Sequence, residues 1–374
     1  MARRHIATPW LRERFLAFSA LTSLAFLFFG QRLLGGLSSM PWLILVFVWL
    51  FVAILGSALA VVRHADHLAE HLGEPYGTLI LTLAITSIEV VSISAVMLHG
   101  ANNPTLARDT LFAVAMIILN GMIGLSLLIG GWRRLEQHYN LQGANAYLGV
   151  IIPLGVLALV LPNFTVSSAG PTLVFSQEMF ISIGSVGLYV AFLFLQTNRH
   201  RAYFAPVDEG NTLPVSAVES TDERTSVWPP VLLLVAYMVP VVFLAEQLAL
   251  PVDYVIETMK APAALAGLTM AVLVATPEAI SAVRSASENH LTRSVNISLG
   301  SVLSTIGLTI PSIVVVSHLT HHPVTLGLQN TDLLLFLLTL TLCLVTFSSG
   351  RTTVMQGAVH LILFASYLFF MFQP

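Results

Sequence analysis

The sequence predicts an all-α polytopic membrane protein with about 11 transmembrane helices, arranged as one accessory helix followed by two inverted five-helix repeats. Three observations support this fold. Hydrophobic residues make up 56% of the 374-residue chain and charged residues only 9%, against roughly 25% charged residues in an average soluble domain. Eleven apolar stretches are long enough to cross a bilayer as helices. The last ten of them fall into two sets of five that share short segments in the same order.

The same composition excludes several classes of function. A net charge of −3 without a block of Lys and Arg residues argues against nucleic acid as a partner. The single cysteine, Cys343, excludes an intrachain disulfide and a cysteine-based metal site. No alternating ten-residue strand pattern of the outer-membrane type is present, so the apolar stretches are expected to cross the lipid bilayer as helices.

The expected spans follow one another closely, with one long hydrophilic interruption. In chain order they are residues 15–30, 40–62, 77–98, 111–131, 146–163, 173–196, 229–249, 262–284, 294–317, 330–347 and 354–372. They divide the chain into an N-terminal cytoplasmic segment with the accessory helix (1–39), a first repeat (40–196), a cytoplasmic hydrophilic linker (197–228) and a second repeat (229–374). We interpret the linker as a solvated hinge between the repeats, and a regulatory cation-sensing loop is the alternative.

Basic residues fall unevenly on the two sides of this arrangement. If the N-terminus is cytoplasmic, the cytoplasmic segments hold 13 arginines, and the opposite segments hold only Arg32, Arg108 and Lys260. Cytoplasmic segments of membrane proteins carry the excess of Lys and Arg. The distribution therefore predicts a cytoplasmic N-terminus and, with 11 spans, a C-terminus on the opposite side of the membrane.

Short segments of the first set of spans recur in the second. Residues 93–96 (Ile-Ser-Ala-Val) recur at 280–283, and residues 123–126 (Ile-Gly-Leu-Ser) resemble residues 306–309 (Ile-Gly-Leu-Thr). Because five is odd, two tandem copies of a five-helix unit must cross the membrane in opposite directions. Inverted repeats are usual in secondary transporters, whose binding site lies near the midplane where the repeats meet. This pattern favours a transporter.

Two glutamates, Glu89 and Glu278, occupy matching positions in the two sets of spans. An ionisable group within a span is costly and marks a functional site, and no basic residue lies mid-span to pair with either glutamate. We expect Pro277 to break its helix just before Glu278 and expose carbonyl groups. The two carboxylates are expected to converge on the pseudo-two-fold axis as the cation- and proton-binding site. A hydrogen-bonded pair that serves packing alone is the alternative.

Neutral oxygens near these glutamates are candidate secondary ligands. They are Thr86 and Ser92 beside Glu89, Ser281 beside Glu278, and Asn120, Asn296, Ser301 and Ser304 in the helices that follow. For the last four, hydrogen bonding between helices is the alternative.

Histidines form two further candidate sites. His64, His67 and His71 share one helical face after the second span, which we interpret as a solvated helix end, with metal binding or pH sensing as the alternative. His360 in the last span is interpreted as a packing residue, with proton relay as the alternative.

Two buried carboxylates surrounded by hydroxyl groups suit a hard cation, since Ca²⁺ takes six to eight oxygen ligands. Without a cation, desolvation and mutual repulsion raise the proton affinity of two close carboxylates. Cation and protons then compete for one pair of groups, which is the basis of antiport. We expect no enzyme activity and no cofactor, because the spans lack metalloprotease, Ser-His-Asp and phosphate-loop motifs. A cation channel without proton exchange is the alternative.

Several motifs resemble the ChaA-type Ca²⁺/H⁺ antiporters, a bacterial branch of the calcium/cation antiporter superfamily. They are Arg-His-Ala-Asp at 63–66, Gly-Glu-Pro-Tyr-Gly at 73–77, Ile-Glu-Val at 88–90, Arg-Asp-Thr-Leu at 108–111, Pro-Glu at 277–278, Gly-Ser-Val-Leu at 300–303 and Phe-Ser-Ser-Gly-Arg-Thr at 347–352. The resemblance implies an inner-membrane antiporter with an accessory helix and two inverted five-helix repeats. Such a protein exports Ca²⁺, and in this branch also Na⁺ and K⁺, in exchange for protons.

The resemblance also implies the binding residues. In the wider family the binding glutamates stand in a Gly-Asn-x-x-Glu pattern in both repeats, and this pattern places them at Glu89 and Glu278. The Gly-Asn pair itself is replaced here by Ile85-Thr86 and by Val274-Ala275. Loss of two amide oxygens from the site is expected to weaken selectivity for Ca²⁺ and to favour monovalent cations.

Overall fold

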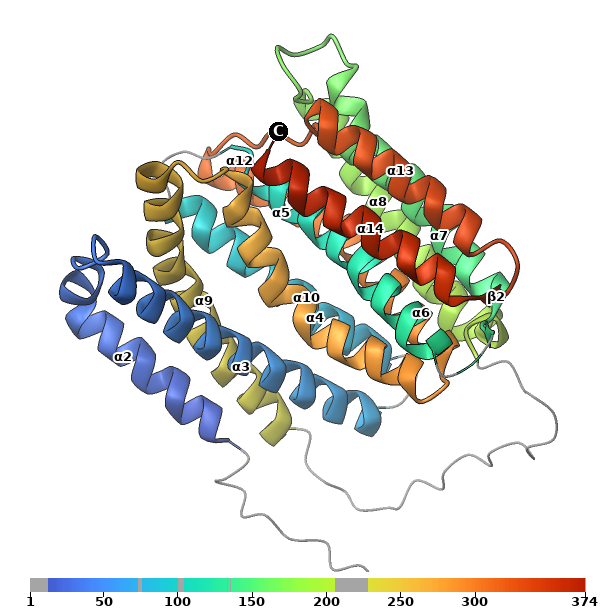
Figure 1. Cartoon of the computed structure of the whole chain (residues 1–374), viewed down its shortest axis with the longest axis horizontal. Coiled ribbons are helices and arrows are strands. Elements are labelled where there is room, and N and C mark those ends of the chain that lie inside the picture. Colours follow the sequence, from blue (N-terminus) through green and yellow to red (C-terminus); the bar gives the residue numbers. More distant parts are fainter. Residues whose placement is uncertain are drawn as a thin grey trace, which may run out of the picture.

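Long apolar helices dominate the computed structural model, which describes residues 13–72, 76–99, 104–132, 134, 136–205 and 228–373. Nine helices in these ranges are long and apolar enough to cross a membrane, and shorter apolar helices cover 82–97 and 330–346. Together they confirm the 11 expected spans (Figure 1). The basic N-terminal residues of the chain and most of the expected linker lie outside the described residues.

The helices of the first half begin with α2 (Arg14–Leu34), the accessory helix. The first repeat comprises α3 (Met40–Leu72), α4 (Tyr76–His99), α5 (Leu106–Met116) continuing through η1 (Ile117–Met122) into α6 (Ile123–Trp132), α7 (Leu141–Gly155) continuing through η2 (Val156–Val160) and η3 (Leu161–Asn163), and α8 (Phe175–Phe194) continuing into η4 (Leu195–Arg199). The second repeat comprises α9 (Trp228–Met259), α10 (Ala264–Ser287), α11 (Leu291–Ser304) continuing through η6 (Thr305–Thr309) into α12 (Ile310–Thr320), α13 (Asn330–Thr346) and α14 (Val354–Phe372).

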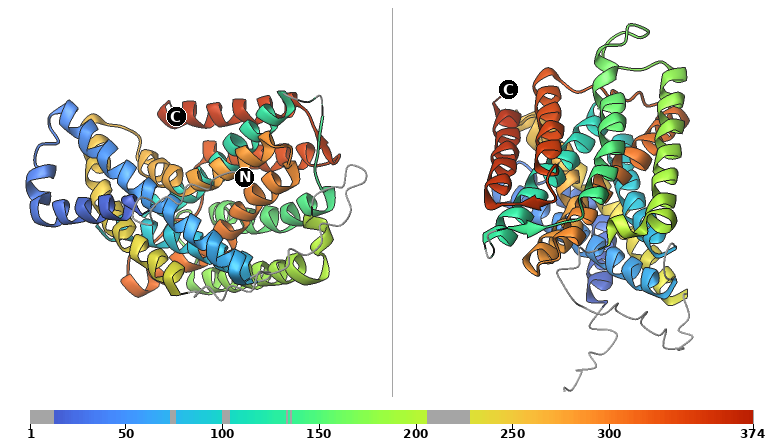
Figure 2. Two further views of the ribbon diagram at one scale, coloured as in Figure 1. Left: turned by 90° about the horizontal axis from the view of Figure 1, so that it is seen from below. Right: turned by 90° about the vertical axis from the view of Figure 1, so that its right-hand side faces the viewer.

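The helices α3 and α9, which open the two repeats, lie against each other along much of their length. The accessory helix α2 packs on both, so that the three form one side of the molecule (Figures 1 and 2). The remaining helices form a second group beyond them. Since α4 contacts both α3 and α9, it lies at the boundary between the two groups.

The helices that carry the two glutamates pack across the boundary between the repeats. In the first repeat α4 contacts η6, α12 and α11 of the second repeat, and in the second repeat α10 packs against α5, η1 and α6 of the first. This reciprocal arrangement is what two inverted copies of one unit produce at their interface. Both partner helices contain a π-helical segment, η1 and η6, at the same place in the repeat. Such segments occur often at functional sites.

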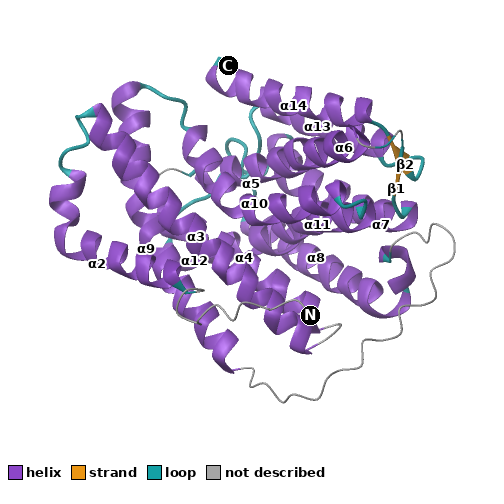
Figure 3. Ribbon diagram, turned by 60° about the horizontal axis from the view of Figure 1, so that its bottom comes forward, coloured by secondary structure: helices purple, strands orange, loops and turns teal. Residues whose placement is uncertain are grey.

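Connections between helices tie the two repeats together at both ends of the bundle. At one end β1 (Gln137–His138) pairs antiparallel with β2 (Arg351–Thr352), as Figure 3 shows. The side chain of Gln137 also donates to the carbonyl of Ala286 at the end of α10, over 3.1 Å. At the other end buried Arg108 pairs with Asp109 over 2.7 Å and donates to the carbonyl of Gly327 in the second repeat. Two of the motifs that carry the family resemblance, at 108–111 and 347–352, therefore take part in the links between the repeats.

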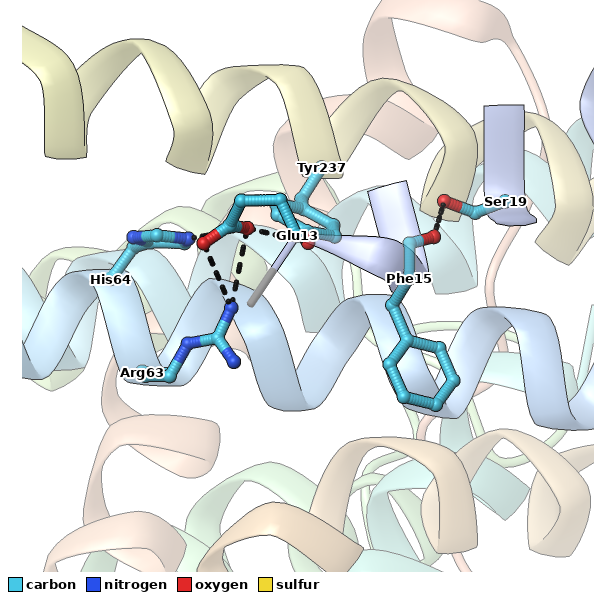
Figure 4. Close-up of polar contacts among 6 residues, drawn as sticks. All are labelled: Glu13, Phe15, Ser19, Arg63, His64 and Tyr237. Carbon is cyan, nitrogen blue, oxygen red and sulfur yellow. Dashed lines mark hydrogen bonds and ion pairs between the residues drawn. The ribbon is translucent and has the colours of Figure 1, made fainter. Parts of the chain in front are cut away.

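The accessory helix is fastened to both repeats by Glu13, the residue that precedes α2 (Figure 4). One carboxylate oxygen of Glu13 accepts from Tyr237 of α9 over 2.7 Å and contacts His64 Nε2 of α3 at 3.2 Å, and Arg63 donates to both oxygens over 3.3 Å. Partial burial favours the neutral acid, but the bonds from Tyr237 and His64 and the charges of His64 and Arg63 outweigh it and hold the pKa of Glu13 below its ordinary value. The ring of Phe15 lies directly on Gly56, where a Cβ atom would be 2.3 Å from it.

We predict that Glu13→Gln lowers the unfolding free energy of the detergent-solubilised protein by about 1 kcal/mol, because the charged acceptor shared by three donors is lost. The effect is no larger because solvent screens this partly exposed carboxylate. Since the folded-state pKa of Glu13 is lowered, its contribution is fully present above the ordinary glutamate pKa and is lost only as the pH falls through the lowered value. Thermal unfolding at neutral pH measures the effect. Glu136→Gln is the matched control, because its pair with Arg351 is exposed; an equal loss in both variants would contradict the prediction.

Candidate functional site

Glu89 is buried inside α4, with 1% of its surface exposed. Its Oε2 atom accepts hydrogen bonds from Thr309 over 2.6 Å and from Thr305 over 3.1 Å. Both threonines belong to η6 of the opposite repeat, so that these bonds cross the boundary between the repeats. Neither threonine was among the residues expected from the sequence, although Thr309 stands in the segment that recurs between the repeats.

Two oxygens beside this contact are buried and have no hydrogen-bond partner among the described residues. They are the other carboxylate oxygen of Glu89, Oε1, and the hydroxyl of Thr86 one helical turn earlier. Ser92, one turn later, is also buried. Buried polar atoms are nearly always hydrogen-bonded, since a buried group without a partner costs free energy. The free oxygen of Glu89 and the hydroxyl of Thr86 can therefore still bind a proton or a cation.

Glu278 is the buried carboxylate of the second repeat, with 8% of its surface exposed. Its Oε2 accepts a hydrogen bond from Ser301 of α11, and Ser304 donates to the carbonyl of Ser301 over 2.8 Å. The helix of Glu278, α10, contacts the helix of Glu89, α4.

The helix α10 continues through Pro277 from Ala264 to Ser287, so the expectation of a broken helix before Glu278 was wrong. Proline removes only one backbone donor. Buried residues on both sides of Pro277 pack α10 tightly against α5 and α11, and this packing holds the helix together.

A cavity of about 290 Å³ reaches Glu278. It is lined by Val62, Thr82, Ile85, Tyr147, Tyr189, Phe192, Leu193, Gln196, Pro277, Glu278, Ser281, Arg293, Asn296, Ile297, Gly300, Ser301, Leu303 and Ser304. Exposed Ser281 and Arg293 place its mouth at the end of the bundle where α10 turns into α11. Since one water occupies about 30 Å³ in the liquid, a hydrated cation fits. Glu89 is absent from the lining, so the two glutamates differ in their access to this cavity.

Asn296 lines the cavity, but its amide group is already hydrogen-bonded. Its Nδ2 atom donates to the backbone carbonyl of Phe204 over 2.8 Å. Among the candidate secondary ligands, the structure thus brings Ser281, Asn296, Ser301 and Ser304 to the cavity with Glu278, and keeps Thr86 and Ser92 on the helix of Glu89.

Asn120 belongs to a different, fully buried network that joins η1 to α13 and α14. It donates to Thr339 over 2.8 Å, and its Oδ1 lies 3.1 Å from His360 Nδ1. Because Oδ1 can only accept, His360 Nδ1 carries a proton, and Nε2 of a neutral His360 accepts from Thr346 over 2.9 Å. The hydrogen bonds of Asn120 therefore connect helices, and they fit the packing interpretation of His360.

The histidines after the second span divide between two environments. His64 is buried and bonded to Glu13, whereas His67 is exposed. The side chain of His71 lies outside the described residues, and the described ones contain no group of three or more His, Cys, Asp or Glu residues that could hold a metal ion.

Comparison with known proteins identifies the family. The sequence model of the sodium/calcium exchanger protein family matches residues 42–198 and 222–373. The chain belongs to the sodium/calcium exchanger family. The two matched segments cover the two five-helix repeats and leave out the accessory helix.

Similarity to known proteins extends over nearly the full length of the chain. The chain is 36% identical over 343 residues to the sodium-potassium/proton antiporter ChaA of Escherichia coli, which covers 90% of this chain and 92% of that protein. Its fold matches the structure of native YfkE with a TM-score of 0.73 at 21% identity, covering 96% of this chain and 100% of that one. It also matches the H⁺/Ca²⁺ exchanger CAX with a TM-score of 0.64 at 15% identity, covering 95% and 87%. These matches confirm the expected family resemblance and helical fold.

We predict that His360→Ala destabilises the folded protein by about 2–4 kcal/mol, because it leaves a cavity and removes the buried partners of Asn120 and Thr346. His360→Gln, which can still donate and accept hydrogen bonds, is expected to recover part of this loss. Thermal unfolding in detergent measures both variants. If His360 serves packing alone, the pH dependence of transport stays unchanged in His360→Gln; a shifted pH profile would instead support a proton relay.

Proposed function

We propose that this member of the sodium/calcium exchanger family is a secondary active cation/proton antiporter, in which cations and protons compete for Glu89 and Glu278. One observation carries the proposal. The two carboxylates are buried on helices of opposite repeats, and no described basic side chain is hydrogen-bonded or ion-paired to either of them. Two close buried anions cannot both persist in a low-dielectric site without a cation or protons.

The unequal access of the two glutamates supports alternating access. Glu278 borders the cavity, whereas Glu89 is covered and bonded to η6 of the other repeat. In a molecule built from inverted repeats, exchanging the conformations of the two repeats would open Glu89 toward the opposite side. A cation would enter through the cavity, displace the protons and leave from the other side after the exchange. A cation channel, the alternative, needs no such asymmetry.

The oxygen set around the carboxylates supports transport of Ca²⁺ together with Na⁺ and K⁺. Hydroxyl groups of Thr86, Ser301, Thr305 and Thr309 surround the glutamates, and amide oxygens are absent from the described contacts of both carboxylates. Ca²⁺ needs six to eight oxygens to replace its hydration shell, so a site without amide ligands discriminates less against monovalent cations. The E. coli relative is named as a sodium-potassium/proton antiporter.

The balance of charge then depends on the ion. One Ca²⁺ exchanged for two protons moves no net charge, whereas one monovalent cation exchanged for two protons is driven by the membrane potential, about 2.3 kcal/mol per charge per 100 mV. With the N-terminus in the cytoplasm, the cavity that reaches Glu278 opens toward the cytoplasm, and the protein exports cations across the inner membrane.

We predict that Glu89→Gln and Glu278→Gln each reduce exchange at least 100-fold, because a neutral amide can neither release a proton nor balance a cation. Proton release from everted vesicles on separate addition of Ca²⁺, Na⁺ and K⁺ measures exchange. Glu288→Gln is the matched control, since Glu288 is exposed at the end of α10, the helix of Glu278, and forms an ion pair with exposed Arg284. Undiminished proton release in either buried variant would overturn the proposed site, and cation current without proton release would favour a channel.

We also predict that Thr309→Val, which keeps the shape of the side chain, changes the ratio of apparent affinities for Ca²⁺ and Na⁺ about ten-fold. The substitution removes the hydroxyl that lies 2.6 Å from Glu89, and a hydrogen bond to a charged group contributes roughly 1.5–3 kcal/mol. The same vesicle assay with graded cation concentrations measures the ratio. Thr341→Val serves as the control because that threonine is exposed and bonded to its own helix. Equal ratios in both variants would exclude Thr309 from ion selection.

A further inference from the structure

The first residues of the expected linker are not free in solution but folded against the bundle. After η4, residues Arg201–Phe204 form the short helix η5, which we call the strap. Asn140, before α7, donates to the carbonyl of Ala202 over 3.1 Å. Gly143 of α7 lies directly under the strap, since a Cβ atom there would be 2.4 Å from the carbonyl oxygen of Tyr203. The strap backbone is therefore seated closely on α7.

The side chain of Phe204 joins two residues that line the cavity. Its ring packs against Tyr147 of α7 with 5.4 Å between ring centres and against Phe192 of α8 with 5.6 Å. Tyr147 and Phe192 are themselves 4.7 Å apart, and Gln196 donates to the Tyr147 hydroxyl over 3.0 Å. The three aromatic rings form one cluster that supports a wall of the cavity.

The backbone of the strap reaches the second repeat. The carbonyl of Phe204 accepts the 2.8 Å hydrogen bond from Asn296 of α11. Ser301, five residues later on α11, is hydrogen-bonded to Glu278. The strap thus joins α7 and α8 of the first repeat to the helix of the second repeat that holds the Glu278 side chain. Closing the cavity in a transport cycle requires these same helices to move relative to one another.

We propose that Phe204 and Asn296 are positioning residues, and that the strap, held by the ring contacts of Phe204 and by the hydrogen bond from Asn296, stabilises the state in which the cavity is open to Glu278. Removing a contact that forms in only one of two states shifts the equilibrium toward the other state. The strap leads into the connection between the repeats, so whatever pulls it away would favour the opposite-facing state. The effect on transport rests on the proposed function, but the position of the equilibrium can be measured without transport.

Two matched reporters measure this equilibrium. Ser281, three residues after Glu278, is exposed in the cavity, and Ser92, three residues after Glu89, is buried in the state seen here. Single cysteines at these positions, in a Cys343→Ala background, are labelled in vesicles of both orientations with a membrane-impermeant methanethiosulfonate. The ratio of the labelling rate at Ser281→Cys to that at Ser92→Cys reports the ratio of the two states, whichever of them dominates.

Phe204→Ala is expected to lower this ratio about ten-fold, because two aromatic contacts are lost, and Phe204→Tyr, which keeps the ring, is expected to restore it. Phe194→Ala is the control, since Phe194 lies near the same end of α8 and is 61% exposed. Asn296→Ala should lower the ratio as well, and the double variant with Phe204→Ala should add less than the sum of the two effects.

An unchanged ratio in Phe204→Ala or, if that variant is misfolded, in Phe204→Leu would overturn the proposal. Fully additive effects of the two substitutions would also overturn it, because Asn296 would then act independently of the strap, as an ion ligand would. Failure of the proposed antiport would appear elsewhere, as exchange that survives Glu89→Gln and Glu278→Gln, and would leave the labelling ratio unaffected.

Discussion

The structure depends on the cost of holding two carboxylates away from water without a basic partner. Glu89 and Glu278 can be buried only because something neutralises them, and in the described residues hydroxyl groups alone are hydrogen-bonded to them. Desolvation makes a lone anion unstable there, so in the proposed antiport the site holds a cation or protons at every stage of the cycle. In that proposal the burial of two side chains leads to coupled transport, since one type of ion leaves only as the other arrives.

In the proposed transport cycle, much of the remaining architecture serves to present these two groups to opposite sides in turn. The glutamate-bearing helices each pack on the third helix of the other repeat, so that neither site helix belongs to one repeat alone. The connections at the two ends of the bundle, through β1 with β2 and through Arg108 with Gly327, link the repeats outside the site. The strap adds a link at the rim of the cavity, where Phe204 joins two repeats that move relative to each other in the proposed cycle.

The sequence predicted the spans, and it singled out two glutamates that the structure buries, because both inferences depend on composition and repetition, which need no knowledge of side-chain packing. It did not predict Thr305 and Thr309 as partners of Glu89, because threonine is common in membrane helices and the side that it faces depends on the π-helical segment η6. The continuous helix through Pro277 reflects packing against neighbours that the local sequence does not reveal. Likewise, the composition of the linker resembles a solvated segment, whereas the aromatic cluster around Phe204 and the hydrogen bonds from Asn140 and Asn296 hold its first residues against the bundle.

Counting the protons released when a cation binds tests the central claim most directly. Calorimetric titration of the purified protein with Ca²⁺ or Na⁺ near neutral pH, repeated in buffers of different ionisation enthalpy, gives that number without a membrane or a transport cycle. Competition at the glutamate pair predicts proton release with each bound cation, and predicts that the double variant Glu89→Gln with Glu278→Gln loses both binding and release. Cation binding without proton release, or equal release by the double variant, would contradict the account.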